Sequence, residues 1–138
     1  LNSLGVKINF ITDGDVSGVI SVAVPKSNID VYIGTGGAPE GVLAAAALNC
    51  LGCQMQTRLV YQDSDQKNKA IELGIKDLNK KYNIEDMVKG DVIFCATGIT
   101  DGDLVKGIKD LGDSFESETF VLHKSSKINK VIKNKLSK

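Results

Sequence analysis

Apolar and polar residues alternate in short runs along most of the chain, and this pattern predicts strands. In the first part of the sequence, three such runs predict short strands at Lys7–Ile11, Val19–Val24 and Val31–Ile33. The continuous apolar run that follows is too short to span a bilayer but long enough for a buried helix. We therefore expect a core helix over Glu40–Leu51, with Gly52 as its C-terminal stop.

The second half of the chain continues the alternation of strands and helices. The predicted elements are a strand at Met55–Tyr61, a polar helix capped by Asp63 or Ser64 and running to Gly74, a helical turn at Ile84–Val88, a fully buried strand at Val92–Ala96, a second core helix at Asp103–Leu111 and a strand at Thr119–His123. This order predicts an α/β fold, a three-layer α/β/α sandwich. Because Val19–Ile33 resembles a hairpin, we expect the sheet to be mixed and mostly parallel. No linker divides the chain, so residues 1–138 form one domain.

The composition narrows the class of protein. Seventeen basic and 17 acidic side chains give a net charge of zero, which argues against a nucleic-acid or membrane-surface binder. No apolar run is long enough to span a membrane, and no signal peptide is visible. Cys50, Cys53 and Cys95 form no disulfide framework, so a cytoplasmic location is predicted. Because the sequence starts at Leu1 rather than Met, we expect a processed chain or part of a longer one.

A glycine-rich loop precedes the predicted core helix. Residues 34–41 read G-T-G-G-A-P-E-G, and glycines let the backbone turn tightly and approach a ligand. Pro39 suits the first position of a helix, where its missing N–H costs little. The free N–H groups at a helix start favour an anion such as phosphate. In that first turn, Glu40 either stabilises the helix dipole or holds a hard cation that also touches the phosphate.

A nucleotide site is a weaker interpretation of the same loop. Pro39 replaces the third glycine of the dinucleotide fingerprint, and Asp63 lies further along the chain than the usual ribose-binding acid. The chain also has a single arginine, Arg58, although arginine is the better bidentate phosphate ligand. A phosphate site here must therefore use backbone N–H groups, lysines, a metal, or residues outside this chain.

Two similar tetrapeptides follow predicted strands. The first contains Asp13-Gly14-Asp15, whose two carboxylates can face one site as metal ligands or as acceptors for sugar hydroxyls. A polar turn without a ligand is the alternative. In the second, Thr100-Asp101-Gly102-Asp103, the threonine or the first aspartate is predicted to cap the following helix.

The remaining chemically reactive residues favour structural roles. Cys50 and Cys53 form a lone C-x-x-C at the end of a helix, without the second pair that zinc needs, so we expect buried and inert thiols. His123 is the only histidine, and no partner motif accompanies it in the sequence. The lysine-rich end, residues 124–138, is predicted to be a solvated face or edge.

Three stretches, Asp13–Asp15, Ile33–Ala46 and Val92–Leu104, are similar in order and spacing to the signature of one enzyme family. Together they resemble the class II fructose-1,6-bisphosphatases across nearly the whole chain. The resemblance implies the fold of the metal-dependent, lithium-sensitive sugar and inositol phosphatases. It also implies hydrolysis of the 1-phosphate of fructose 1,6-bisphosphate, a gluconeogenic reaction, with Mg²⁺ or Mn²⁺. Some members of the family also act on sedoheptulose 1,7-bisphosphate.

The resemblance also assigns roles to particular residues. It implies that Asp13, Gly14 and Asp15 contact the sugar phosphate, that the Gly37 backbone contacts the substrate, and that Glu40 is a metal ligand. The family's N-terminal portion, which holds most metal ligands, the water-activating group and the phosphate-binding arginines, is not in this chain. We therefore expect the C-terminal half of a homo-oligomeric enzyme, with no catalytic residue of its own. A non-catalytic anion-binding or regulatory module is the alternative.

Overall fold

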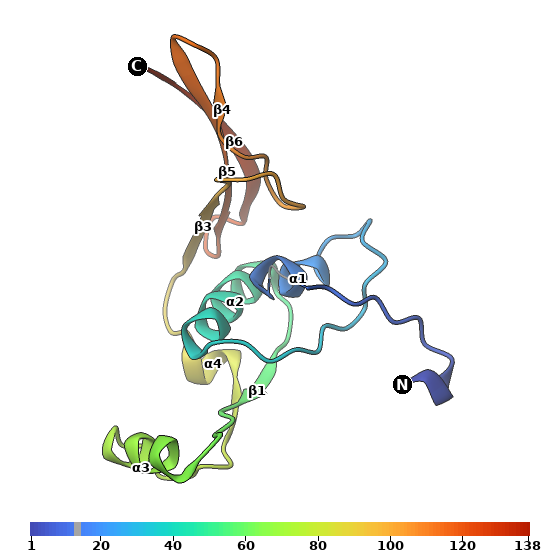
Figure 1. Cartoon of the computed structure of the whole chain (residues 1–138), viewed down its shortest axis with the longest axis vertical. Coiled ribbons are helices and arrows are strands. Elements are labelled where there is room, and N and C mark those ends of the chain that lie inside the picture. Colours follow the sequence, from blue (N-terminus) through green and yellow to red (C-terminus); the bar gives the residue numbers. More distant parts are fainter. Residues whose placement is uncertain (13–14) are drawn as a thin grey trace.

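The computed structural model describes the whole chain except residues 13 and 14 and the side chain of Asp15. Figure 1 shows two helices in the middle of the molecule, a twisted sheet at one end and a small helical arm at the other. The helices are a 3-10 turn at Asn2–Leu4, α1 (Asp15–Ser21), α2 (Ala38–Leu51), α3 (Ser64–Glu72) and α4 (Ile84–Met87). The strands are β1 (Gln56–Arg58), β2 (Lys81–Asn83), β3 (Ile93–Thr97), β4 (Lys109–Asp110), β5 (Ser114–His123) and β6 (Ile128–Ser137).

Every strand pair in the described residues is antiparallel. β1 pairs with β2 in a two-stranded ribbon. In the larger sheet, β5 pairs along its whole length with β6 on one side, and with β3 and β4 on the other. The buried apolar side chains of this sheet, Phe94, Phe120 and Leu122, cluster with α1 and α2 on one face only. The predicted α/β/α sandwich with a mostly parallel sheet is therefore wrong, and the chain is a mixed α/β structure with two small antiparallel sheets.

The three strands predicted before the glycine loop are not formed. The first half of Val19–Val24 lies in α1, where Val16, Val19 and Ile20 follow the helical i, i+3, i+4 spacing and face the core. Lys7–Ile11 and Val31–Ile33 have no strand beside them among the described elements, and Phe10, Ile11, Val31 and Ile33 are exposed. Alternation alone does not make a strand, because the backbone also needs a partner to accept its hydrogen bonds.

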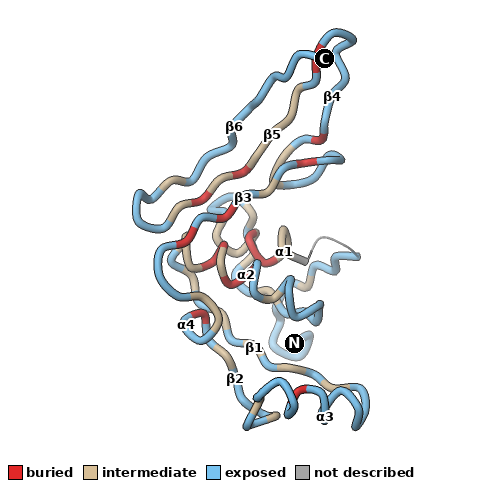
Figure 2. The backbone as a smooth tube through the Cα atoms, turned by 90° about the vertical axis from the view of Figure 1, so that its left-hand side faces the viewer, coloured by how far each residue is buried: buried red, intermediate tan, exposed pale blue. Residues whose placement is uncertain are grey.

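Helix α2 confirms the predicted core helix. It starts after Gly37 with Pro39 in the first turn, and it ends at Gly52, whose φ of 71° is the left-handed conformation of a helix stop. Four small or apolar residues of α2 are buried: Ala44, Ala45, Ala47 and Leu48. They belong to two clusters, one shared with α1 and α4 and the other shared with α1 and the sheet. Figure 2 shows buried positions concentrated around this helix.

The strand expected at Val92–Ala96 exists as β3 but is buried on one face only. Phe94 is 6% exposed, whereas its neighbour Ile93 is 66% exposed. Phe94 packs with Phe120 and Leu122 of β5 against Ala47 of α2. The expectation of complete burial was wrong. Successive side chains of this strand point to opposite faces of the sheet, and only one of these faces is covered, although both carry apolar residues.

The helix predicted over Asp103–Leu111 is replaced by a folded loop that leads into β4. The Asp101 carboxylate does not cap a helix. It accepts a hydrogen bond from the Gly107 N–H at 2.9 Å, while the Ile108 N–H donates to the Ile99 carbonyl at 3.2 Å. The loop therefore closes on itself, and a Cβ on Gly107 would lie 2.7 Å from the Thr100 backbone. Such a close approach requires glycine at position 107.

Other local predictions are confirmed. Asp63 caps α3 by accepting a hydrogen bond from the Gln66 N–H at 2.8 Å. The helical turn α4 falls within Ile84–Val88, and the strand expected at Thr119–His123 is the second half of β5. Among the described residues, none of the helices has the length and apolar character needed to cross a membrane.

The burial pattern gives a direct test of the fold. Leu122 is fully buried, so we expect Leu122→Ala in the 138-residue chain to lower the free energy of unfolding by about 2–5 kcal/mol. Ile93→Ala, on the uncovered face of β3, serves as the control and should cost about 1 kcal/mol or less. Urea denaturation of both variants measures the difference. Equal losses would contradict the assignment of the two faces.

Candidate functional site

The glycine loop and the first turn of α2 form a compact polar site at one end of that helix. Gly37 is the N-cap residue, with φ −66° and ψ 150°. Its N–H donates a hydrogen bond of 2.7 Å to Oε2 of Glu40, three residues later. This contact fixes the carboxylate against the loop while Glu40 stays exposed. Because only Oε2 is used, Oε1 can face a cation without breaking the contact.

The glycines of the loop make room for side chains that fold over it. A Cβ on Gly37 would lie 2.7 Å from Oε2 of Glu40 and would displace the carboxylate. A Cβ on Gly34 would collide with the Tyr32 hydroxyl. The same tyrosine ring approaches α1, where a Cβ on Gly18 would lie 2.9 Å from Tyr32 Cε2. Tyr32 thus links the loop to α1, and the two glycines beside it allow that packing.

The predicted substrate residues Asp13 and Gly14 lie outside the described residues, as does the side chain of Asp15. The backbone of Asp15 begins α1. The next residue, Val16, packs against the same cluster as Cys50 and Leu51 from the last turn of α2. Glu40 is at the opposite end of that helix, whose 14 residues span about 20 Å. The roles of Asp13, Gly14, Asp15, Gly37 and Glu40 remain predictions.

Glu40 suits a hard divalent cation, but it is a single ligand. Mg²⁺ and Mn²⁺ prefer oxygen donors, and an exposed carboxylate at a helix start provides one. In the part of the chain that the structure describes, no three His, Cys, Asp or Glu side chains gather closely enough to hold a metal ion. The residues here therefore fit one side of a metal site, and further ligands are needed to complete it.

Comparison with known proteins identifies the family. Residues 1–136 match the family described as "Bacterial fructose-1,6-bisphosphatase, glpX-encoded". The chain belongs to this family. The match covers almost the whole chain, including the glycine loop and α2, so the family resemblance of the sequence motifs is confirmed.

Individual relatives agree with this assignment. The chain is 40% identical over 146 residues to a fructose-1,6-bisphosphatase class 2 from Haemophilus influenzae, covering 95% of this chain and 44% of the relative. It is 36% identical over 140 residues to a D-fructose 1,6-bisphosphatase class 2/sedoheptulose 1,7-bisphosphatase from a Synechococcus strain, covering 92% of this chain and 40% of the relative. The chain thus spans less than half the length of these relatives.

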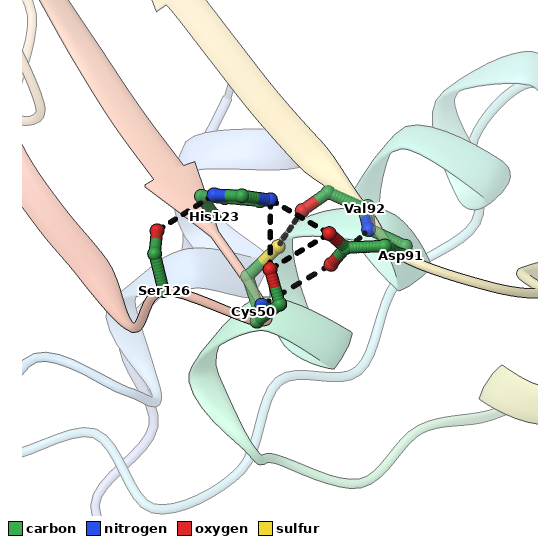
Figure 3. Close-up of polar contacts among 6 residues, drawn as sticks. Cys50, Asp91, Val92, His123 and Ser126 are labelled. Atoms are coloured by element: carbon green, nitrogen blue, oxygen red, sulfur yellow. Dashed lines mark hydrogen bonds and ion pairs between the residues drawn. The ribbon is translucent and has the colours of Figure 1, made fainter.

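A second polar cluster, which the sequence analysis missed, surrounds His123 of this bisphosphatase-family chain (Figure 3). The His123 Nε2 atom lies 2.8 Å from Asp91 Oδ2, and its Nδ1 lies 2.6 Å from Ser126 Oγ. Ser125 donates from its hydroxyl to Asp91 Oδ2 at 2.7 Å and from its N–H to Oδ1 at 3.1 Å. His123, Ser125 and Ser126 lie 32 or more positions after Asp91 in the sequence, so no local motif could reveal this cluster.

The contacts of this cluster indicate a structural role. It joins the start of β3 to the turn between β5 and β6, where the Lys124 N–H also donates to the Val92 carbonyl. The Cys50 thiol of α2 donates to the same carbonyl at 3.4 Å. Partial burial, and secondarily the charge of Asp91, raise the pKa of Cys50, which makes a reactive thiolate less accessible. The cluster therefore holds α2, β3 and the β5–β6 turn together.

The pKa of Asp91 gives a pH-dependent prediction. Hydrogen bonds from Ser125, and then from His123, lower the pKa of Asp91 from 3.8 to about 2. A carboxylate with a lowered folded-state pKa contributes stability above its unfolded pKa, and this contribution is lost as the pH falls toward 2. We expect the difference in urea midpoint between wild type and Asp91→Asn to be full at pH 6 and to shrink below about pH 4.

An NMR titration of the carboxyl groups provides the control for this prediction. In Ser125→Ala, the Asp91 midpoint should move from about 2 toward 3.8, because the largest contribution to the shift is removed. A stability difference that does not change between pH 6 and pH 3, together with an unshifted midpoint in Ser125→Ala, would contradict the described contacts.

Proposed function

We propose that this chain forms part of an enzyme that hydrolyses the 1-phosphate of fructose 1,6-bisphosphate to give fructose 6-phosphate, with Mg²⁺ or Mn²⁺. The observation that supports the proposal is the family match over residues 1–136, which includes a glycine loop joined to Glu40 at the start of a firmly packed helix. Relatives named for this reaction are 36–40% identical to the chain.

The residues of this chain act by binding and positioning. Apart from the Gly37 N–H, which donates to Glu40, the backbone N–H groups of the loop and of the first turn of α2 bind a phosphate oxygen, because they have no partner inside the helix. Gly37 allows the substrate to approach the backbone, and Glu40 would hold a divalent cation. Asp13 and Asp15, with Gly14 between them, bind the sugar phosphate. The chemistry that a bound divalent cation would supply is neutralisation of phosphate charge and a lowered pKa of bound water.

We also propose where this chain lies within the complete enzyme. The chain corresponds to the C-terminal half of a longer homo-oligomeric cytoplasmic enzyme, and most metal ligands and the water-activating group lie outside it. We place fructose 1,6-bisphosphate first among substrates because the Haemophilus relative is named for it alone. Activity toward sedoheptulose 1,7-bisphosphate, which appears in the name of the Synechococcus relative, is an additional possibility to assay.

The role of Glu40 is tested by Glu40→Gln in the full-length protein. Glutamine keeps the shape and can still accept the Gly37 N–H, but it removes the negative charge that a cation needs. We expect activity at saturating Mn²⁺ to fall by at least about tenfold, equivalent to about 1.4 kcal/mol. Phosphate release across a Mn²⁺ titration measures the effect. Glu85→Gln, in the first turn of α4, is the matched control and should leave turnover unchanged.

The aspartates of the first loop are expected to act on substrate binding. Asp13→Asn or Asp15→Asn in the full-length protein should mainly raise KM, because the lost charges hold the substrate. Asp101→Ala, in the second loop, removes the acceptor of the Gly107 N–H and should lower stability by about 1 kcal/mol with KM unchanged. If Asp101→Ala abolished turnover at unchanged stability, the roles of the two loops would be reversed.

The division of the enzyme between this chain and the remainder is tested by assaying residues 1–138 alone. We expect no phosphate release from fructose 1,6-bisphosphate with either Mg²⁺ or Mn²⁺, because one carboxylate cannot collect several divalent ions or activate water. The full-length enzyme is the positive control. Release at a comparable rate by residues 1–138 would place the complete site within this chain and overturn the proposal.

A further inference from the structure

The two-stranded ribbon of β1 and β2 carries exposed polar side chains on one of its faces. In this antiparallel pair, Gln56 lies opposite Asn83, and two residues further along Arg58 lies opposite Lys81. Side chains two positions apart in a strand point to the same side, so these four residues share one face. Gln54 belongs with them, because it lines the same hollow as Gln56 and Asn83. All five residues are exposed, and we call this surface the ribbon face.

Arg58 and Lys81 place two positive charges directly opposite each other on the ribbon face. The Cβ atoms of such a cross-strand pair lie about 4.5–5.5 Å apart, and like charges at this position destabilise a sheet. No ion pair among the residues that the structure describes includes Arg58 or Lys81. No described carboxylate therefore pairs with either cation, and an anion bound between them would remove the repulsion.

A neighbouring lysine on the opposite face of the ribbon does have partners. Nζ of Lys80 lies 2.8 Å from Oδ1 of Asp86 and 4.8 Å from the centre of the Tyr82 ring. Tyr82 alternates with Lys81 and Asn83 along β2, so its ring points away from the ribbon face. The five residues of the ribbon face include no aromatic side chain, which disfavours a stacked nucleobase as the ligand.

The amide end of the ribbon face borders an open hollow. The hollow has a volume of about 460 Å³ and is lined by Gln54, Met55, Gln56 and Asn83. Amide side chains both donate and accept hydrogen bonds, as hydroxyl groups do. Because a strand rises about 3.4 Å per residue, the two cations lie about 7 Å along the ribbon from the facing amides. A ligand that contacts both groups needs negative charge at one end and hydroxyl groups at the other.

We propose that the ribbon face binds a phosphorylated polyol, such as a sugar monophosphate. Its phosphate contacts Arg58 and Lys81, and its hydroxyl groups contact the amides around the hollow. A guanidinium group presents paired N–H donors that match phosphate oxygens, and the lysine adds a second charge. The ribbon face shares no residue with the glycine loop, Glu40 or the first aspartate loop. The inference therefore goes beyond the proposed function and does not depend on it.

Arg58 allows a direct test because it is the only arginine in the chain. In an isotope-labelled sample of residues 1–138, its Nε–H gives a single side-chain NMR signal. We expect fructose 6-phosphate to shift this signal to saturation, with a Kd about tenfold below that of inorganic phosphate, because hydrogen bonds between hydroxyl groups and amides add to the charge contact. Fructose without a phosphate should leave the signal in place.

Three variants separate the roles of the charge and the amides. Lys81→Gln removes one of the facing cations and should weaken fructose 6-phosphate binding by at least about tenfold. Gln56→Ala should weaken binding of fructose 6-phosphate but not of inorganic phosphate. Lys67→Gln, which removes the same charge from the exposed surface of α3, is the matched control and should change neither Kd.

A stability measurement distinguishes binding from a structural role of Lys81. Without ligand, Lys81→Gln should keep or raise the urea midpoint, because the substitution removes a repulsion. A lowered midpoint together with an unchanged Kd would assign Lys81 to the fold and overturn the inference.

Calorimetric titration of the full-length protein with fructose 6-phosphate separates the ribbon face from the site at Glu40. We expect one binding step that is lost in Lys81→Gln and kept in Glu40→Gln. Binding that is lost only in Glu40→Gln, with an Arg58 signal that fructose 6-phosphate does not move, would overturn the inference and leave the proposed function intact. Equal affinities for inorganic phosphate and fructose 6-phosphate would contradict the assignment to a polyol.

Discussion

Close packing of the alanine-rich helix α2 is the interaction on which the rest of this structure depends. Ala44, Ala45 and Leu48 pack with α1 and α4, while Ala47 packs with the sheet. Small side chains let several elements approach one helix at once, and protein interiors of this density tolerate little change in volume. Both hydrophobic clusters therefore contain residues of α2, and the packing in each cluster fixes the position of this helix.

This packing explains how the chain can position a carboxylate that is itself exposed. Glu40 lies only one turn before the buried alanines, and the Gly37 N–H holds its carboxylate. At the other end of the helix, Cys50 contacts the same Val92 carbonyl that anchors the β5–β6 turn. A site supported by a packed helix keeps its geometry better than one on a free loop, and this matters for reactions that depend on positioning.

Local signals in the sequence predicted α2, its glycine stop, the cap of α3 and the strand within β5, because each depends on neighbouring residues. The failures came from long-range effects. Lys7–Ile11 has the alternation of a strand but lacks a paired neighbour, and Asp103–Leu111 gives way to a loop closed by the bond between Asp101 and Gly107. The partners of His123 lie across the sheet, so they appear only in the folded chain.

The contact between the glycine loop and Glu40 could be anticipated from the sequence because the residues are close neighbours in the chain. The glycine loop and Glu40 form a contiguous motif, whereas no three His, Cys, Asp or Glu side chains gather closely enough to hold a metal ion in the part of the chain that the structure describes.

Anomalous diffraction from Mn²⁺ in crystals of the full-length protein with fructose 1,6-bisphosphate is the most direct test of the role proposed for Glu40. We expect a Mn²⁺ peak about 2.0–2.2 Å from a carboxylate oxygen of Glu40, with the other protein ligands contributed from outside residues 1–138 and a substrate phosphate next to the start of α2. Manganese bound elsewhere, with Glu40 contacting only the Gly37 N–H, would contradict it.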